Sequence, residues 1–164
     1  MEVTRSYERL QEVTKGCINL KEPPQKYSQP AYESLKFYQD LCELRILIYQ
    51  ITEKFKPIHI RLVSQMRDAA RSAKQNIREG YRRGSVGEFA RGIKISQASL
   101  EELLGDLEDC KADGLMSPEE FERANQLGRS ARYLSDRYLM SLYQMEKEST
   151  WKMPGGRLRR KRNL

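Results

Sequence analysis

The sequence is poor in the residue types that hold metals and carry out nucleophilic catalysis. Its 164 residues include one histidine, His59, and three widely separated cysteines, Cys17, Cys42 and Cys110. The odd number and the lack of a Cys-x-x-Cys pair argue against a disulfide framework and a thiolate metal site. Di-iron sites of helical bundles need Glu-x-x-His on two helices, and the sequence has none. We therefore expect no metal, no cofactor and no enzyme.

Long apolar runs are also absent. None approaches the roughly 20 residues of a membrane span, and residues 1–10 lack the apolar core of a secretion signal. We expect a cytoplasmic protein that contacts no membrane. In a reducing compartment the three cysteines need no role beyond packing as thiols.

No segment shows the period-two alternation of a half-buried strand. Instead, four segments space their apolar residues by three and four positions, the pattern of left-handed helix packing. These segments run over residues 37–55, 62–80, 89–110 and 121–145. Short links between long helices imply antiparallel neighbours. The sequence thus predicts an all-α protein, an antiparallel up-down-up-down four-helix bundle over residues 30–147, with a flexible N-terminal extension (1–29) and a basic disordered tail (148–164).

Proline, glycine and serine mark the expected helix ends. Pro30 fits the first position of the first helix, and Pro57 separates the first helix from the second. Gly114 fits a left-handed end to the third helix. Ser117 then fits as the N-cap of the fourth helix, with Pro118 at its first position. These marks agree with the four periodic segments.

The stretch SAKQNIREGYRRGSVGEF, residues 72–89, combines glycine with basic residues. It lacks the Gly-x-x-x-x-Gly-Lys-Ser/Thr spacing of a phosphate-binding loop, and no strand precedes it. Gly80 lies where a C-cap glycine of the second helix would lie, and Ser85 with Glu88 matches a capping box. The stretch is therefore interpreted as a corner between two helices.

Charge is distributed unevenly along the chain, whose formal net charge is +7. Residues 149–164 carry six basic and no acidic side chains. Residues 54–94 carry eleven basic and three acidic side chains, a net of +8, and residues 95–122 carry one basic and nine acidic, a net of −8. The first of these two segments suits polyanions, and the second suits a basic partner or a neighbouring subunit.

Basic residues of the second helix recur at offsets of 0, 4, 7, 11 and 15, which places them on one face, and Arg83 follows at the corner. Such a stripe suits phosphate tracking. It also suits a solvated face that Asp68 and Glu79 partly neutralise. With the cations of the tail, the predicted nucleic-acid-binding set is Arg67, Arg71, Lys74, Arg78, Arg82, Arg83, Arg157, Arg159, Arg160, Lys161 and Arg162.

One polar residue, Asn76, interrupts the apolar seam of the second helix. A polar side chain at a core position can fix helix register at some cost in stability. We predict a structural role for Asn76 and for the residues that follow it, Glu79 and Gly80.

This region resembles a bacterial family of four-helix bundles, the large-subunit rRNA intervening-sequence proteins. That family includes the accessory variability determinant (Avd) proteins of diversity-generating retroelements. Its signature, small-x-x-Asn-Ile-x-Glu-Gly-x-x-Arg, appears here as Ala73, Asn76, Ile77, Glu79, Gly80 and Arg83. Its Ser-Leu-x-Glu-Leu run appears as Ser99, Leu100, Glu102 and Leu103. The resemblance covers residues 31–145, and Arg78 departs from it, because the family usually has alanine there.

The resemblance implies a bundle that assembles into a ring-like homopentamer and has no catalytic activity. For the Avd branch it implies that a basic surface binds nucleic acid and a reverse transcriptase while a template RNA is copied. We therefore expect a non-catalytic scaffold whose partners are RNA or DNA, held through phosphate contacts, and a reverse transcriptase. The alternative is a protein-only adaptor whose basic face binds an acidic protein.

Overall fold

The structure, a computed structural model, describes residues 30–148. The predicted N-terminal extension and the basic tail after residue 148 lie outside the described residues. Four α-helices and no strand occur in the described part: α2 (Lys36–Thr52), α3 (Ile60–Arg82), α4 (Val86–Ala112) and α5 (Pro118–Lys147). Short 3₁₀ turns precede the first two of them: η1 (Ala31–Ser34) and η2 (Pro57–His59).

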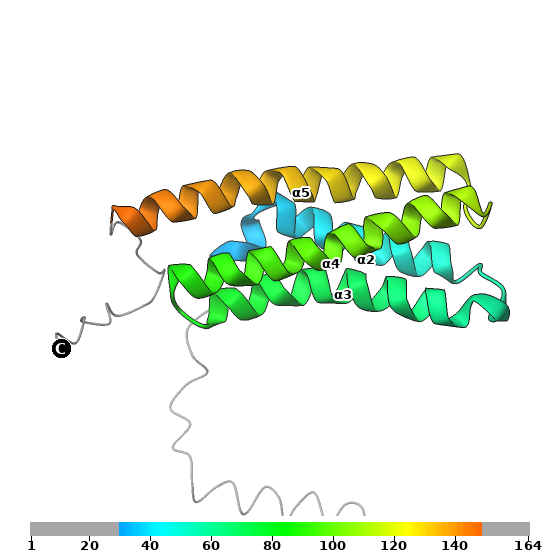
Figure 1. Ribbon diagram of the computed structural model, residues 1–164, viewed down its shortest axis with the longest axis horizontal. Helices are drawn as coiled ribbons and strands as arrows, with labels where there is room; N and C mark the ends of the chain where they lie inside the picture. Colours follow the sequence, from blue (N-terminus) through cyan, green and yellow to red (C-terminus); the bar gives the residue numbers. More distant parts are fainter. Residues whose placement is uncertain (1–29, 149–164) are drawn as a thin grey trace, which may run out of the picture.

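The four helices run side by side along the long axis of the molecule (Figure 1). α2 packs against α3 and α5, and α4 also packs against α3 and α5, whereas the diagonal pairs do not pack directly on each other. The links between consecutive helices, residues 53–59, 83–85 and 113–117, are short, so consecutive helices are antiparallel neighbours. The predicted all-α four-helix bundle is confirmed.

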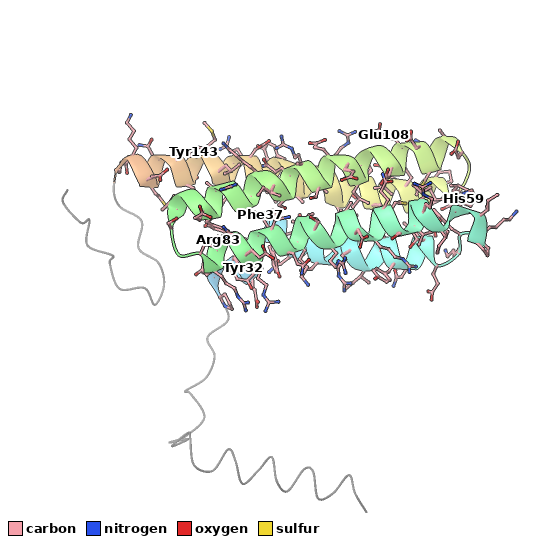
Figure 2. All side chains as sticks on the ribbon, turned by 60° about the horizontal axis from the view of Figure 1, so that its bottom comes forward. Tyr32, Phe37, His59, Arg83, Glu108 and Tyr143 are labelled. Atoms are coloured by element: carbon pink, nitrogen blue, oxygen red, sulfur yellow. The ribbon has the colours of Figure 1, made fainter. Side chains whose placement is uncertain are left out.

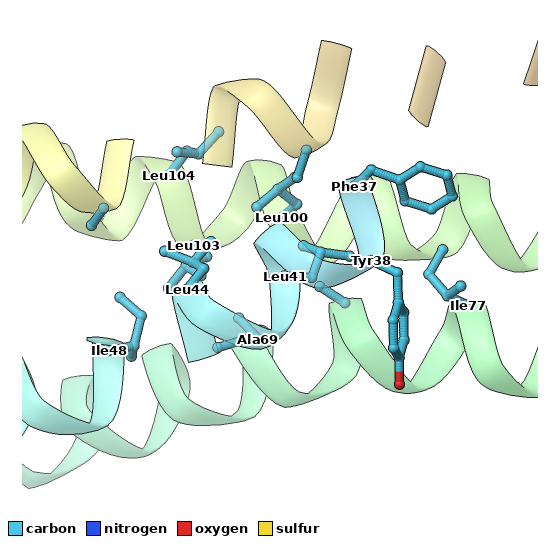
Figure 3. Close-up of a cluster of buried hydrophobic side chains, with 14 of the residues drawn as sticks. Phe37, Tyr38, Leu41, Leu44, Ile48, Ala69, Ile77, Leu100, Leu103 and Leu104 are labelled. Atoms are coloured by element: carbon cyan, nitrogen blue, oxygen red, sulfur yellow. The ribbon is translucent and has the colours of Figure 1, made fainter. Parts of the chain in front are cut away.

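One apolar core joins all four helices (Figure 3). Its fully buried side chains include Leu44 and Ile48 of α2, Ile77 of α3, Leu103 of α4 and Leu142 of α5. Burial of such a side chain stabilises the fold by about 1.5–3 kcal/mol. Apart from Ile77, which lies one position after Asn76, these residues lie on the apolar seams of the sequence, so the bundle is held mainly by the seams that predicted it.

Two of the three cysteines lie in the described part, and both are free thiols. Cys110 is buried in the core, where burial, followed by the charge of Asp106, raises the pKa of its thiol to about 11. Cys42 is partly buried at the edge of the same core. A thiol with a raised pKa is a poor nucleophile, which suits the predicted packing role.

The start of α5 has the predicted caps. Ser117 Oγ accepts a hydrogen bond from the Glu120 N–H at 3.2 Å, and the Glu120 carboxylate accepts one from the Ser117 N–H at 3.0 Å. Pro118 occupies the first turn. Gly114 has a φ of 69°, the left-handed conformation that ends α4.

The start of the first helix differs from its prediction. Pro30 precedes the 3₁₀ turn η1 instead of opening the helix, and α2 begins at Lys36. Between them, Leu35 is extended, with φ −70° and ψ 126°. The turn places the Tyr32 ring 5.0 Å from the ring of Tyr81 in α3. A packing contact with another helix therefore decides where α2 begins.

The corner between α3 and α4 also differs, because Gly80 is not a C-cap. α3 continues through Gly80 to Arg82, and the left-handed residue is Gly84, with a φ of 80°. Ser85 is the N-cap of α4, as predicted, and accepts a hydrogen bond from the Glu88 N–H at 3.1 Å. The other half of the predicted capping box does not form, because the Glu88 carboxylate pairs with Arg83 instead.

Gly80 instead marks the place where α3 and α4 come closest. A Cβ on Gly80 would lie 2.9 Å from the Cα of Gly92 in α4. A Cβ on Gly92 would lie 2.8 Å from the Gly80 Cα and 2.5 Å from the carbonyl oxygen of Asn76. Real Cβ atoms do not approach backbone atoms so closely, so both positions need glycine for this crossing.

We predict that Gly92→Ala lowers the free energy of unfolding by about 1–3 kcal/mol, because the two helices must move apart. Gly105→Ala is the matched control, since a Cβ on Gly105, on the same helix, meets nothing within 4 Å. That control should gain about 0.5–1 kcal/mol from the better helix propensity of alanine. Urea unfolding followed by circular dichroism measures both. Equal effects of the two substitutions would contradict the close crossing.

Candidate nucleic-acid interface

The predicted basic stripe lies on the side of α3 that faces α2. Arg67 is partly buried there: its Nε donates a hydrogen bond to Thr52 Oγ1 at 2.8 Å, and its guanidinium carbon lies 4.3 Å from the centre of the Tyr49 ring. Both partners belong to α2. Arg67 therefore holds two helices together, and its charge is mostly engaged inside the bundle.

The next four cations of the stripe are more accessible. Arg71 is exposed and pairs with Asp68, one turn earlier, at 2.8 Å. An exposed pair of this kind contributes only about 0–1 kcal/mol, so a polyanion can displace it. Arg78 and Arg82 are exposed and Lys74 is half-buried. None of these three side chains forms a hydrogen bond or ion pair with another described residue.

These cations act on neighbouring groups of α2 and η1. Burial raises the pKa of the Cys42 thiol, and Lys74 is the strongest influence that opposes the rise. Burial also raises the pKa of Tyr32, while Arg78 and Arg82 lower it. The three cations therefore lie along the seam where α3 meets α2 and η1.

α2 adds one cation that the sequence analysis did not include. Arg45 lies one turn before Tyr49, with its guanidinium carbon 5.6 Å from the ring centre. The i, i+4 spacing of the pair is visible in the sequence, but the face of α2 that meets α3 is not. We define the basic seam as Arg45, Arg67, Arg71, Lys74, Arg78 and Arg82.

The structure separates Arg83 from the basic seam. Its side chain reaches α4, where Nη1 pairs with Glu88 Oε2 at 3.2 Å. Arg83 lines a cleft of about 90 Å³ at the glycine crossing, together with Asn76, Glu79, Glu88 and Arg91. Two arginines and two glutamates balance in charge, so the cleft does not select for an anion.

The signature residue Asn76 lies at the rim of the core and not inside it. Its side chain is half-buried, and its Nδ2 donates hydrogen bonds to the Ser72 carbonyl oxygen at 2.8 Å and to Ser72 Oγ at 3.1 Å. The buried line of α3 runs through Ala73 and Ile77 instead. The expected core position is therefore wrong, while a structural role for Asn76 and Glu79 stays a prediction.

The single histidine lies apart from the basic seam. His59 lies at the end of the bundle opposite Arg83 and Tyr32 (Figure 2), and its ring meets that of Phe55 at 6.3 Å. Across residues 30–148, no group of three or more His, Cys, Asp or Glu side chains is arranged to hold a metal ion.

Two acidic side chains of α4 pair with arginines of α5. Glu101 pairs with Arg132 at 2.7 Å, and Glu108 pairs with Arg129 at 3.4 Å. All four are at least partly exposed, so the pairs contribute little to stability. They do neutralise part of this side of the bundle, whereas Lys74, Arg78 and Arg82 of the basic seam form no ion pair with another described residue.

Asp106 is the exception among these acids, because its side chain is almost completely buried. Its Oδ1 accepts a hydrogen bond from Gln65 Nε2 at 3.0 Å, whereas Oδ2 has no hydrogen-bond partner among the described residues. Burial, and then the nearby charges of Glu102 and Asp109, raise the pKa of Asp106 above its usual 3.8.

The described part is thus an all-α four-helix bundle with a basic seam along α3 and α2 and with ion pairs between α4 and α5. Its residues 33–135 match the family of 23S rRNA-intervening sequence proteins. The match spans more than half of the chain, and the chain belongs to this family, as the signature around Asn76 and Gly80 predicts. A search of curated protein sequences found no match. No helix within residues 30–148 is long and apolar enough to cross a membrane.

We predict that Asp106→Asn raises the free energy of unfolding at pH 7. A carboxyl with a raised pKa binds more protons folded than unfolded, so its contribution falls as the pH rises from 3.8 through the folded pKa. The free energy of unfolding of the variant should not show this decrease with rising pH. At lower pH, the variant and the parent protein should have the same free energy of unfolding. Glu108→Gln, on the exposed side of α4, should change stability by less than about 0.5 kcal/mol. Identical pH profiles for Asp106→Asn and the parent would show that Asp106 titrates normally.

Proposed function

We propose that this protein is a non-catalytic scaffold that binds nucleic acid through the basic seam. The observation that carries the proposal is the row of Lys74, Arg78 and Arg82, which lacks ion-pair partners among the described residues. Arg71 extends the row, because its pair with Asp68 is exposed and weak. Such a row attracts a polyanion by charge and releases its counterions on binding.

The dimensions of the seam fit a nucleic-acid backbone. At 1.5 Å per residue, the stretch from Arg71 to Arg82 spans roughly 16 Å of helix. A strand of B-DNA rises 3.4 Å per phosphate, so the stretch matches roughly five phosphates. Cations on a rigid helix lose little freedom on contact. Phosphate contacts position a protein without reading bases, so we expect binding with little sequence preference.

Within this proposal, the partners are RNA or DNA together with a reverse transcriptase, as in the Avd branch of the family. The protein acts as a homo-oligomer, with the pentamer as the proposed state. Copies arranged around a ring would repeat the seam, and each copy would add phosphate contacts at high effective concentration. The basic tail, residues 149–164, would add further contacts outside the bundle.

One observation favours the protein-only adaptor as the second candidate. Two large apolar side chains beside the seam are exposed on α2, Ile46 and Tyr49. Exposed apolar and aromatic groups next to arginines are typical of protein interfaces. An adaptor would purify free of RNA, and its binding to an acidic protein would not require nucleic acid.

We predict that reversing Arg71, Lys74 and Arg78 to Glu abolishes defined binding of RNA, because it places repulsive charge on the docking face of every copy. The parent protein should lose affinity steeply with salt and tolerate changes of RNA sequence. Its log–log salt slope should be steeper than that of the variant by roughly 0.7–0.9 for each phosphate that the variant no longer binds. Fluorescence anisotropy with labelled RNAs at several salt concentrations measures both quantities.

The matched control reverses Arg123, Arg129 and Lys147 to Glu, which changes net charge equally but on α5. Those residues lie away from the seam. The reversal of Arg123 and Arg129 removes their exposed ion pairs with Glu43 and Glu108 and an exposed hydrogen bond from Arg129 to Asn125. The control should keep most of its RNA affinity. If the seam variant binds RNA as the parent does, or if both variants lose affinity equally, the basic seam is a solvated face.

We predict a different result from deletion of residues 149–164. The tail must be ordered on contact, which costs entropy for each fixed residue. Its deletion should weaken RNA binding broadly and flatten the salt slope while the bundle and its assembly persist. Anisotropy and native mass spectrometry measure these effects. A deletion that abolishes the complex as fully as the seam reversal would place the main binding site in the tail.

A further inference from the structure

The bundle is incomplete at the end where the described chain begins. α5 extends past the beginning of α2 and η1 (Figure 1). The last close aromatic contact of α2 with α5 is between Phe37 and Tyr138, whose ring centres are 5.5 Å apart. α5 continues for a further nine residues to Lys147. α2 therefore does not cover the last turns of α5 on one side.

An open groove lies at this place, with a volume of about 910 Å³. Leu35 and Phe37 form one wall, and Tyr138 and Met140 contribute to the other. The Met140 side chain is 70% exposed. Apolar surface of this kind costs free energy in water at roughly 25 cal/mol per Å², so a covering segment would be stabilised there.

The N-terminal segment of the chain has the pattern that such a groove accepts. Its residues 3–20 place apolar side chains at helical spacing: Val3, Tyr7, Leu10, Val13, Cys17 and Leu20. An amphipathic helix with anchors at this spacing fits an apolar groove between helices. Eighteen residues of helix would measure about 27 Å, and α5 from Leu134 to Glu148 measures about 21 Å, so the lengths agree.

The chain also enters at the right place. Pro30 is followed by η1 and then by Leu35, which lines the groove. The nine residues 21–29 that join the apolar stripe to Pro30 reach up to about 30 Å when extended. A tethered segment acts at an effective concentration of roughly millimolar, which favours it over a second copy of the chain.

We propose that residues 3–20 bind in this groove as an amphipathic helix and complete the bundle beside α5. Residues 1–20 hold three acidic and three basic side chains and are neutral overall, so the rim of the groove, where Arg137 and Glu148 have opposite charges and Lys36 pairs with Asp40, does not repel them. This inference is independent of nucleic-acid binding.

The test uses the full chain and amide hydrogen exchange in α5, residues 139–147. Leu10→Asp places a charge in the middle of the apolar stripe and should speed exchange of these amides about tenfold or more, since burying a leucine contributes about 1.5–3 kcal/mol. Gln11→Asp is the control, because adjacent helical residues point about 100° apart. It should leave the exchange rates unchanged.

Substitutions in α5 test the other side of the contact. Met140→Asp should speed the same amides as much as Leu10→Asp does, and the double variant should exchange no faster than either single variant. Tyr133→Asp changes another exposed apolar side chain of α5, 62% exposed and outside the groove, and should act independently of Leu10→Asp.

Two outcomes would overturn the proposal. One is equal exchange in Leu10→Asp, Gln11→Asp and the parent protein. The other is protection of residues 139–147 that appears only as protein concentration rises over about a hundredfold range, which mass action assigns to a second copy as the occupant. Protection that does not depend on concentration and is lost in Leu10→Asp supports the N-terminal segment.

Discussion

The close crossing of α3 and α4 is the constraint on which the rest of the bundle depends. Gly80 and Gly92 leave no side chain between the two backbones, so α3 can meet α4 only through this face. The basic seam lies about half a helical turn away on α3. Fixing one face against α4 therefore turns the cations towards α2. The family signature around Gly80 is thus explained by packing, and the seam is its geometric consequence.

The sequence predicts the fold well because its strongest signals are local. Four apolar seams and the Ser117–Pro118 cap need only neighbours three or four residues away, and the structure agrees with them. Gly80 was assigned wrongly because a glycine that ends a helix and a glycine that admits another helix look alike in one sequence. Only Gly92, on the facing helix, distinguishes them. The same explanation applies to Asn76, which was expected in the core and lies at its rim, because packing against α4 decides which side of α3 is buried.

The candidate site was predicted in part for the same reason. Helical periodicity places Arg71, Lys74, Arg78 and Arg82 on one face, and the structure finds them along one seam. Helical periodicity cannot show that Arg67 is held by Thr52 and Tyr49 of another helix. Nor can it show that Arg83 turns to α4, or that Arg45 joins from α2. Those roles depend on tertiary partners, which one-dimensional spacing does not contain.

The two charged sides of the bundle differ in how their charges are paired. On α4 and α5, Glu101 and Glu108 meet arginines directly, the arrangement expected where charge serves only solvation. On α3, Lys74, Arg78 and Arg82 follow one another at intervals of one turn without such partners. Like charges at this spacing cost about 0.2–0.5 kcal/mol per pair. A polyanion bound along the row would replace this repulsion with attraction, whereas water and salt only weaken the repulsion. This unpaired repulsion on a rigid helix is the feature on which the proposed binding of nucleic acid depends.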